Sequence, residues 1–168
     1  MARNQTVKLR ERVSLALGLN RFSKTHFLFL KSHTLFLIFM AIANVFINTF
    51  FMNQTDDTNV VLLYNMLNYI FTGLGMFPAV YLMRKASAAV CAIVGVSLYN
   101  VMCVCLLLLN NNAADYAYLL GIFNGIASGF YWLSYSTRLT QSTNDSNRES
   151  AVSLISVFGS IVNLVFPM

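Results

Sequence analysis

The chain has 168 residues, of which 57% are hydrophobic and only 10% are charged, against about 25% charged in an average soluble domain. This composition excludes an ordinary soluble domain and is typical of a membrane protein. The net charge is +5, and we attribute it to membrane topology and contact with anionic headgroups rather than to nucleic-acid binding.

Five segments approach the length of about 20 apolar residues that a helix needs to cross a bilayer. Backbone groups inside hydrocarbon must find their hydrogen bonds within the segment, so each segment is predicted to be a helix. The sequence therefore predicts an all-α, polytopic transmembrane helix bundle at residues 33–168, preceded by a basic cytoplasmic segment at residues 1–32. The predicted spans cover residues 35–52, 60–83, 86–109, 116–139 and 151–168.

The basic N-terminal segment has two alternative interpretations. Leu9, Val13, Ala16 and Leu17 could form one face of a helix on the inner leaflet, or the segment could be a disordered leader. We expect no cleaved signal peptide, because the chain continues as NVFINTFFM after Ala43 without a small-residue cleavage site.

The basic residues lie on alternate connections between the predicted spans. All 11 of them fall in the N-terminal segment, at Arg84 and Lys85, or at Arg138 and Arg148. The connections NQTDDT and NNNAAD contain acidic and amide side chains but no lysine or arginine. Because basic loops stay on the cytoplasmic side, we expect a multi-pass protein of the cytoplasmic membrane with its N-terminus inside. The acids then expected outside are Asp56, Asp57 and Asp115.

Small residues recur at helical spacing in the fourth predicted span. Gly121, Gly125 and Gly129 are four residues apart and therefore lie on one stripe of a helix. Such a stripe lets another helix approach closely in lipid, so we expect these glycines to form a helix-packing face. The second predicted span carries a comparable stripe of small and polar residues, namely Asn65, Asn68, Thr72, Gly75 and Ala79.

An adjacent face of the fourth predicted span is polar and aromatic. It carries Asn124, Ser128, Trp132 and Tyr135 at the same helical spacing. These side chains either bond to other helices or line a cavity that water and a solute enter, and the spacing leaves both interpretations open. The first predicted span contains an amide pair four residues apart, Asn44 and Asn48.

The interiors of the predicted spans contain no Asp, Glu, Lys, Arg or His. Such residues are the usual proton carriers and binders of charged solutes inside membranes, so the sequence offers no evident proton carrier. It also lacks a phosphate-binding glycine loop, a metal-ligand cluster and a nucleophile with a base at a believable spacing. We therefore predict no catalytic residue, no metal, no cofactor and no enzyme activity. The third span contains three cysteines, for which we expect packing roles: Cys91, Cys103 and Cys105.

Residues 121–167 resemble the fourth span, cytoplasmic loop and fifth span of a major facilitator superfamily transporter. The resemblance rests on the glycine-rich helix that ends in GFYWLSY, on the polar loop NDSNRES, and on a small-residue helix that reaches a proline. The loop places Asn147 and Arg148 just before the fifth span, where the family carries an Asn-Arg pair.

Three features depart from the family pattern. The loop after the second span reads GMFPAVYLMRK, where the family has G-x-x-x-D-R-x-G-R-K, so the glycine and the terminal basic pair remain but the acid is missing. The fourth span has Gly121 where many proton-coupled members carry an arginine, and Phe166 rather than glycine precedes Pro167. The resemblance therefore does not imply proton-driven antiport.

The resemblance implies a fold of two six-span halves with a solute site near the midplane between them. This chain would supply the N-terminal half, truncated in or just after the fifth span, and its partners would be the bilayer, a small neutral or amphiphilic solute and a missing C-terminal half. Gate or loop-ordering roles would fall to Arg84, Lys85, Asp145 and Arg148. The residues implied to line the cavity are Asn44, Asn48, Asn124, Ser128, Tyr131, Trp132 and Tyr135.

A second hypothesis belongs to another functional class. The glycine and serine stripes also suit a small membrane scaffold or assembly partner that binds other helices and transports nothing.

Overall fold

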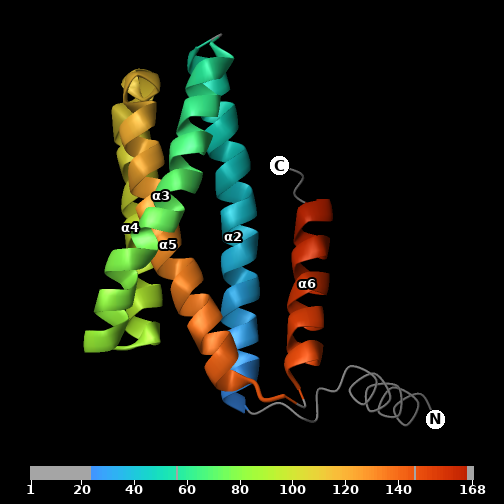
Figure 1. Ribbon diagram of the computed structural model, residues 1–168. Helices are drawn as coiled ribbons and strands as arrows, with labels where there is room; N and C mark the ends of the chain where they lie inside the picture. The colour runs from blue at the N-terminus through green and yellow to red at the C-terminus, as the bar shows by residue number, and fades with distance from the viewer. Residues whose placement is uncertain (1–23, 56, 146, 166–168) are drawn as a thin grey trace, which may run out of the picture. The chain divides into compact units, whose positions relative to one another are not determined.

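The computed structural model describes residues 24–55, 57–145 and 147–165. In this part of the chain every regular element is a helix, which confirms the predicted all-α class (Figure 1). The two interpretations of the N-terminal segment concern residues that lie outside the described part of the chain. Phe166 and Pro167 also lie outside it.

The five long helices overlap the five predicted spans in sequence. They are α2 (Lys24–Gln54), α3 (Thr58–Lys85), α4 (Ala88–Leu109), α5 (Ala117–Ser142) and α6 (Arg148–Val165). Two 3₁₀ turns, η2 (Asn110–Asn112) and η3 (Ala114–Tyr116), connect α4 to α5.

By length and composition, three stretches among the described residues are apolar enough to cross a membrane: His26–Gln54, Thr58–Lys85 and Ala88–Asn112. Helix α5 is more polar because amide, hydroxyl and glycine residues recur along it, and α6 is rich in serine. That α5 and α6 also span the membrane remains a prediction.

Helix α2 begins at Lys24, well before the predicted start of the first span at residue 35. Its 31 residues, at about 1.5 Å each, give a length of about 46 Å. The hydrocarbon core is about 30 Å thick, so α2 is long enough to tilt or to extend its first turns into the headgroup region. Lys31, in those first turns, is exposed.

Side-chain caps fix where α3 and α4 begin. The carboxylate of Asp57 accepts a hydrogen bond from the Asn59 backbone N–H at 2.9 Å, and the Ser87 hydroxyl accepts one from the Val90 N–H at 3.2 Å. Each cap satisfies a backbone donor that the first turn of a helix leaves open. Only Ala86 and Ser87 separate α3 from α4, so these helices form a tight antiparallel hairpin.

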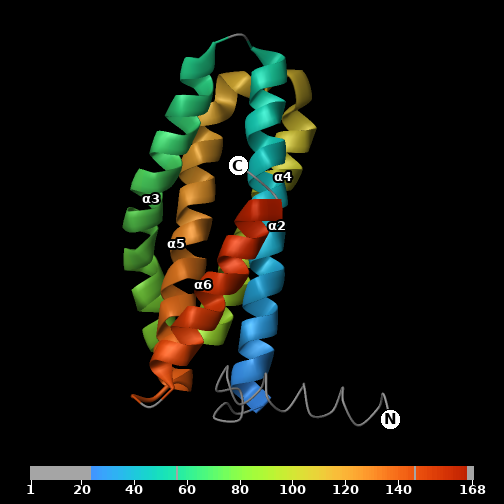
Figure 2. The same ribbon diagram turned by 90° about the vertical axis from the view of Figure 1, so that its right-hand side faces the viewer.

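The described chain divides into two compact units. The central unit comprises residues 44–139, and the terminal unit comprises the described residues before and after it, 24–43 and 140–165. Within the central unit, α5 contacts both α3 and α4 (Figures 1 and 2). The buried core of this unit includes Tyr64, Tyr99, Met102, Leu106 and Ala127.

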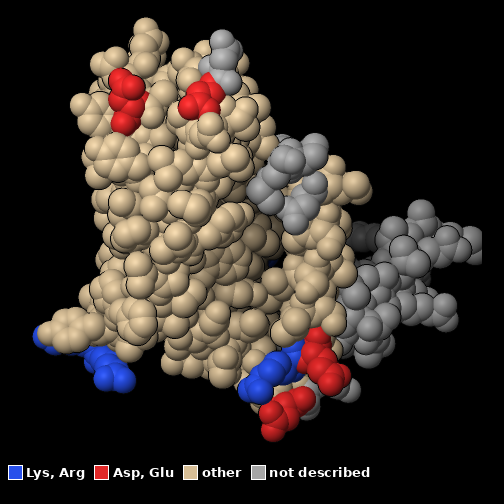
Figure 3. Space-filling model, turned by 45° about the horizontal axis from the view of Figure 1, so that its top comes forward, with Lys and Arg blue, Asp and Glu red and all other residues tan. Residues whose placement is uncertain are grey.

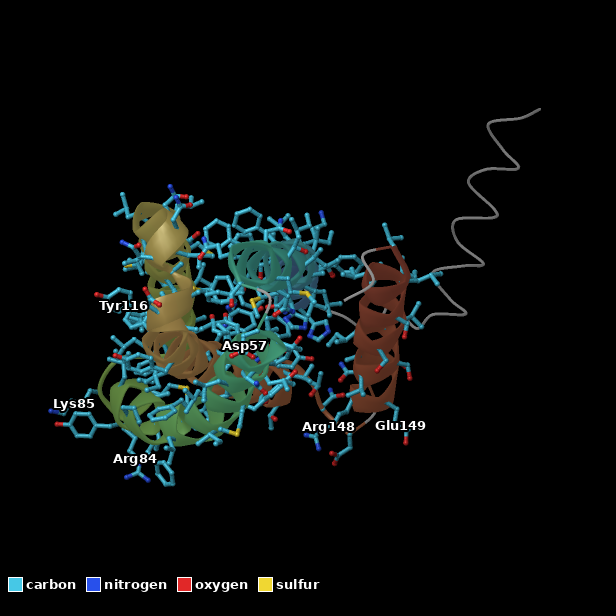
Figure 4. All side chains as sticks on the ribbon, turned by 90° about the horizontal axis from the view of Figure 1, so that it is seen from above. Asp57, Arg84, Lys85, Tyr116, Arg148 and Glu149 are labelled. Carbon is cyan, nitrogen blue, oxygen red and sulfur yellow. The ribbon has the colours of Figure 1, made fainter. Side chains whose placement is uncertain are left out.

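The charged groups of the central unit lie at its two ends. Asp57 precedes α3 and Asp115 lies in η3, whereas Arg84 and Lys85 end α3 next to the turn into α4. Figure 3 shows acidic side chains at one end of this unit and basic ones at the other, with an uncharged surface between them. Arg84 and Lys85 project outward from their helix (Figure 4), and Lys85 Nζ lies 4.4 Å from the centre of the Tyr81 ring.

Candidate functional site

The glycine face of α5 packs directly on the backbone of α3. A methyl group at Gly121 would lie 2.6 Å from the carbonyl oxygen of Tyr64, and one at Gly125 would lie 2.5 Å from that of Asn68. At Gly129 the corresponding atom is the Thr72 carbonyl oxygen, also at 2.5 Å. No side chain fits at these distances, so the three glycines allow the two backbones to approach.

The opposite face of α5 packs on α4. A methyl group at Gly95 of α4 would lie 2.8 Å from the Tyr131 backbone nitrogen and 2.9 Å from the Ala127 carbonyl oxygen. The Ser134 hydroxyl donates a hydrogen bond to the carbonyl oxygen of Ala88. The Sγ atom of Cys91 lies 3.4 Å from the Phe130 carbonyl oxygen, so this cysteine has the packing role that the sequence predicts.

The sequence prediction missed these contacts on α4. Ala88, Cys91 and Gly95 recur at steps of three and four, which places three small residues on one helical stripe. The same rule that identified the glycines of α5 would therefore have found them.

Amide side chains of the predicted site form hydrogen bonds between helices. Asn124 Nδ2 donates to the Tyr64 hydroxyl at 2.8 Å in a fully buried setting, and the Tyr64 ring also packs at a tilt against Phe51 of α2 with ring centres 5.2 Å apart. Asn65 Nδ2 donates to Asn48 Oδ1 at 3.2 Å and thereby connects α3 to α2. Tyr64 was not singled out from the sequence, because an isolated tyrosine in an apolar run has no periodic signal.

An aromatic cluster occupies α5 beyond the glycines. The rings of Tyr131 and Trp132 meet edge to face with centres 5.8 Å apart, and those of Trp132 and Tyr135 do so at 5.6 Å. Tyr131 is buried, whereas Trp132 and Tyr135 are half-buried. Ser128 is buried one turn before Trp132, and Asn44 of α2 is half-buried. The cluster offers a rigid apolar surface with indole and hydroxyl polar groups.

The predicted gate residues lie in two units. Arg84 and Lys85 belong to the central unit, and Asp145 and Arg148 belong to the terminal unit. The carboxylate of Asp145 lies 3.8 Å from the Arg148 guanidinium, with both side chains in solvent. An exposed ion pair of this kind contributes little to stability, in the range of about 0–1 kcal/mol.

The loop before α6 is ordered by an asparagine pair rather than by that ion pair. The Asn144 backbone N–H donates to Asn147 Oδ1 at 2.8 Å, and the Arg148 N–H donates to the Asn144 carbonyl oxygen at 2.9 Å. Asn147 is 6% exposed, so its side chain supports the turn that begins α6. Within the terminal unit, His26 Nδ1 and the Ser142 hydroxyl also form a hydrogen bond of 2.9 Å.

No group of three or more His, Cys, Asp or Glu side chains that could hold a metal ion occurs among the described residues. The buried polar side chains of the described central unit are the amide of Asn124 and the hydroxyls of Ser128 and Ser134, together with the phenol groups of its buried tyrosines, and all of these are hydrogen-bonding groups rather than partners for ion pairs.

The match to the family model of the Major Facilitator Superfamily extends over residues 3–167. The chain belongs to this superfamily. Major facilitator proteins are multi-pass transporters rather than enzymes, which confirms the predicted membrane and non-enzymatic class.

A curated protein is also similar in sequence to this superfamily member. The chain is 26% identical over 129 residues to a protein of Geobacillus stearothermophilus described as "Uncharacterized protein in sodM 3'region". The alignment covers 77% of this chain and 60% of the relative, so the chain spans less than two thirds of the relative's length. No solved structure matches the chain significantly.

Proposed function

We propose that the chain is the N-terminal part of a secondary transporter that moves a small, neutral or amphiphilic solute across the cytoplasmic membrane. The proposal is carried by the family match over residues 3–167. In the superfamily, transport requires two helical halves that rock around a shared midplane site. The five helices described here would supply one side of that site, and we infer that a second set of helices completes it.

The charge distribution supports an uncharged solute. Within residues 44–55 and 57–139 the acidic and basic side chains are confined to the connections and helix ends, at Asp57, Arg84, Lys85, Asp115 and Arg138. A charged solute at the midplane would lose its hydration without gaining an opposite charge, which costs several kcal/mol. Amide and hydroxyl groups suffice for a neutral solute.

The solute would meet the aromatic cluster of α5 and the amides of α2. We propose that Tyr131, Trp132 and Tyr135 stack on its apolar or ring-shaped parts, and that Ser128, Asn44 and Asn48 supply hydrogen bonds. The hydrogen bond to Tyr64 assigns the Asn124 nitrogen to helix contact, so in this proposal Asn124 supports the cavity wall from behind.

Orientation belongs to the same proposal. With the basic end of the central unit in the cytoplasm, Arg84 and Lys85 would contact anionic headgroups and the inner gate. The N-terminus would then lie inside the cell.

Trp132 makes the proposed site directly observable, because it is the single tryptophan of the chain. We expect saturable changes in tryptophan fluorescence when the purified chain is titrated with neutral sugars, nucleosides or uncharged amphiphiles. Organic anions and cations form the comparison set. Tyr135→Ala should weaken the response, whereas Tyr69→Ala, which removes a side chain 76% exposed on α3, should not.

Two results would count against the proposal. A response confined to charged solutes would overturn the assignment of a neutral substrate. Accumulation of a solute in liposomes that contain this chain alone would overturn the requirement for a second set of helices.

A further inference from the structure

A buried polar cluster lies where α3, α4 and α5 meet in the central unit. Tyr64, Tyr99 and Asn124 come from these three helices and are 2%, 1% and 0% exposed. Asn124 Nδ2 donates to the Tyr64 hydroxyl at 2.8 Å. The cluster is polar in a unit whose other core residues are mainly apolar.

Two buried amide oxygens, one on α3 and one on α5, have no hydrogen-bond donor from the described residues. They are Oδ1 of Asn124 and Oδ1 of Asn68, both buried. Asn68 lies one turn after Tyr64 on α3, and its backbone faces Gly125, the residue that follows Asn124 on α5. The two oxygens therefore come from facing stretches of adjacent helices.

A buried acceptor without a donor costs about 1–3 kcal/mol. In folded proteins such groups are usually satisfied by internal water, which makes about three hydrogen bonds on average. The Tyr64 hydroxyl oxygen already accepts from Asn124, so its own hydrogen remains available to donate. The amide oxygens of Asn68 and Asn124 and the hydroxyl of Tyr64 thus offer two acceptors and one donor, the complement of a water molecule with two donor hydrogens and a lone pair.

A monovalent cation fits the same groups poorly. Monovalent metal ions require several oxygen ligands, and burial of such an ion costs several kcal/mol unless an opposite charge compensates it. The sequence places no Asp or Glu between Asp57 and Asp115, so α3 and α4 supply no carboxylate to the cluster. A neutral ligand with two O–H donors satisfies the groups without that cost.

We propose that one water molecule is bound between α3 and α5, where it donates to Oδ1 of Asn68 and Oδ1 of Asn124 and accepts from the Tyr64 hydroxyl. This internal water links α3 to α5. The close glycine contacts between these two helices leave no room for a ligand larger than water. Its role is to complete the hydrogen bonding of the helix contact, independently of any solute.

Radiolytic hydroxyl-radical labelling of the full chain in nanodiscs, read by mass spectrometry, tests the proposal. Radicals form from water, so a bound water labels an adjacent side chain even when that side chain is buried. With each rate normalised to the intrinsic reactivity of the residue type, Tyr64 should be modified at a rate close to that of Tyr116, which is 43% exposed, and faster than Leu106, which is 0% exposed.

Two variants and one ion exchange complete the experiment. In Asn124→Leu the normalised labelling of Tyr64 should fall to the level of Leu106 while that of Tyr116 is unchanged. Asn68→Leu, at a less buried position, should have the same effect. Normalised wild-type labelling of Tyr64 no faster than that of Leu106 would overturn the proposal. Loss of Tyr64 labelling when sodium replaces choline in the buffer would overturn it in favour of a cation.

Discussion

Gly125 marks the closest approach between α5 and α3. Its missing side chain leaves room for the carbonyl oxygen of Asn68, which would stand 2.5 Å from a methyl group, and the Phe71 Cβ would stand 2.8 Å from it. Since the obstacle at Asn68 is backbone, it cannot move aside as a flexible side chain would. In lipid, where no hydrophobic effect drives helices together, such close packing is a main source of association energy.

We expect Gly125→Ala to destabilise the chain by about 1–3 kcal/mol, because the added methyl group overpacks a tight contact. Gly73→Ala on α3 is the matched control, since nothing lies within 4 Å of a methyl group there. It should be neutral or stabilising by up to about 1 kcal/mol through helix propensity. Unfolding in detergent micelles of increasing SDS content measures both free energies, and equal effects would show that the glycine contact is unimportant.

At the level of elements, Gln54 connects the end of α2 to the α4–α5 connection. Its side-chain amide donates to the Asn110 carbonyl oxygen and accepts from the Ala114 backbone N–H at 3.2 Å. Asn110 has a positive φ of 44°, which is uncommon for a residue other than glycine. One side chain therefore satisfies backbone groups on both sides of this sharp turn.

Gln54→Ala should release the connection between α4 and α5. Loss of two hydrogen bonds of about 1 kcal/mol each should accelerate hydrogen exchange at the Ala114 amide by about tenfold or more. Asn53→Ala is the matched control, because Asn53 is exposed and adjacent. Unchanged exchange at Ala114 in the Gln54 variant would show that the turn is held by its own backbone.

At the scale of the whole molecule, the charges specify an orientation. In the central unit the acidic end and the basic end are separated by the length of α3, which has 28 residues. Anionic inner-leaflet headgroups and the positive-inside rule favour the basic end in the cytoplasm. The superfamily match gives no orientation by itself, so labelling must decide it.

Cysteine labelling in intact cells measures this orientation. We expect Asn111→Cys, in the exposed connection after α4, to react with a membrane-impermeant maleimide from outside. Ala86→Cys, exposed at the turn between α3 and α4, should react only in inverted vesicles. The unsubstituted chain gives the background from Cys91, Cys103 and Cys105. The reverse pattern would invert the proposed topology and remove the basis for the cytoplasmic gate.

The sequence by itself determined the helical class, the positions of the five long helices in the described chain and the faces on which their glycines lie. These properties follow from local rules, because apolar length and the 3.6-residue period are written into consecutive residues. The exception was the start of α2, which extends to Lys24 because helix formation continues past the end of the apolar run.

Only the tertiary structure decided which side chains contact each other across helices. Periodicity placed Asn124 on a helix face but could not identify Tyr64 as its hydrogen-bond partner. It also could not identify the contact of Gln54 with Ala114 in the α4–α5 connection. The two residues of each pair are 60 residues apart in sequence. Partners across helices depend on how far each helix is shifted and rotated against its neighbour, and a difference of one residue turns a side chain by about 100°. That arrangement is set by packing all the helices together, so no single segment contains it.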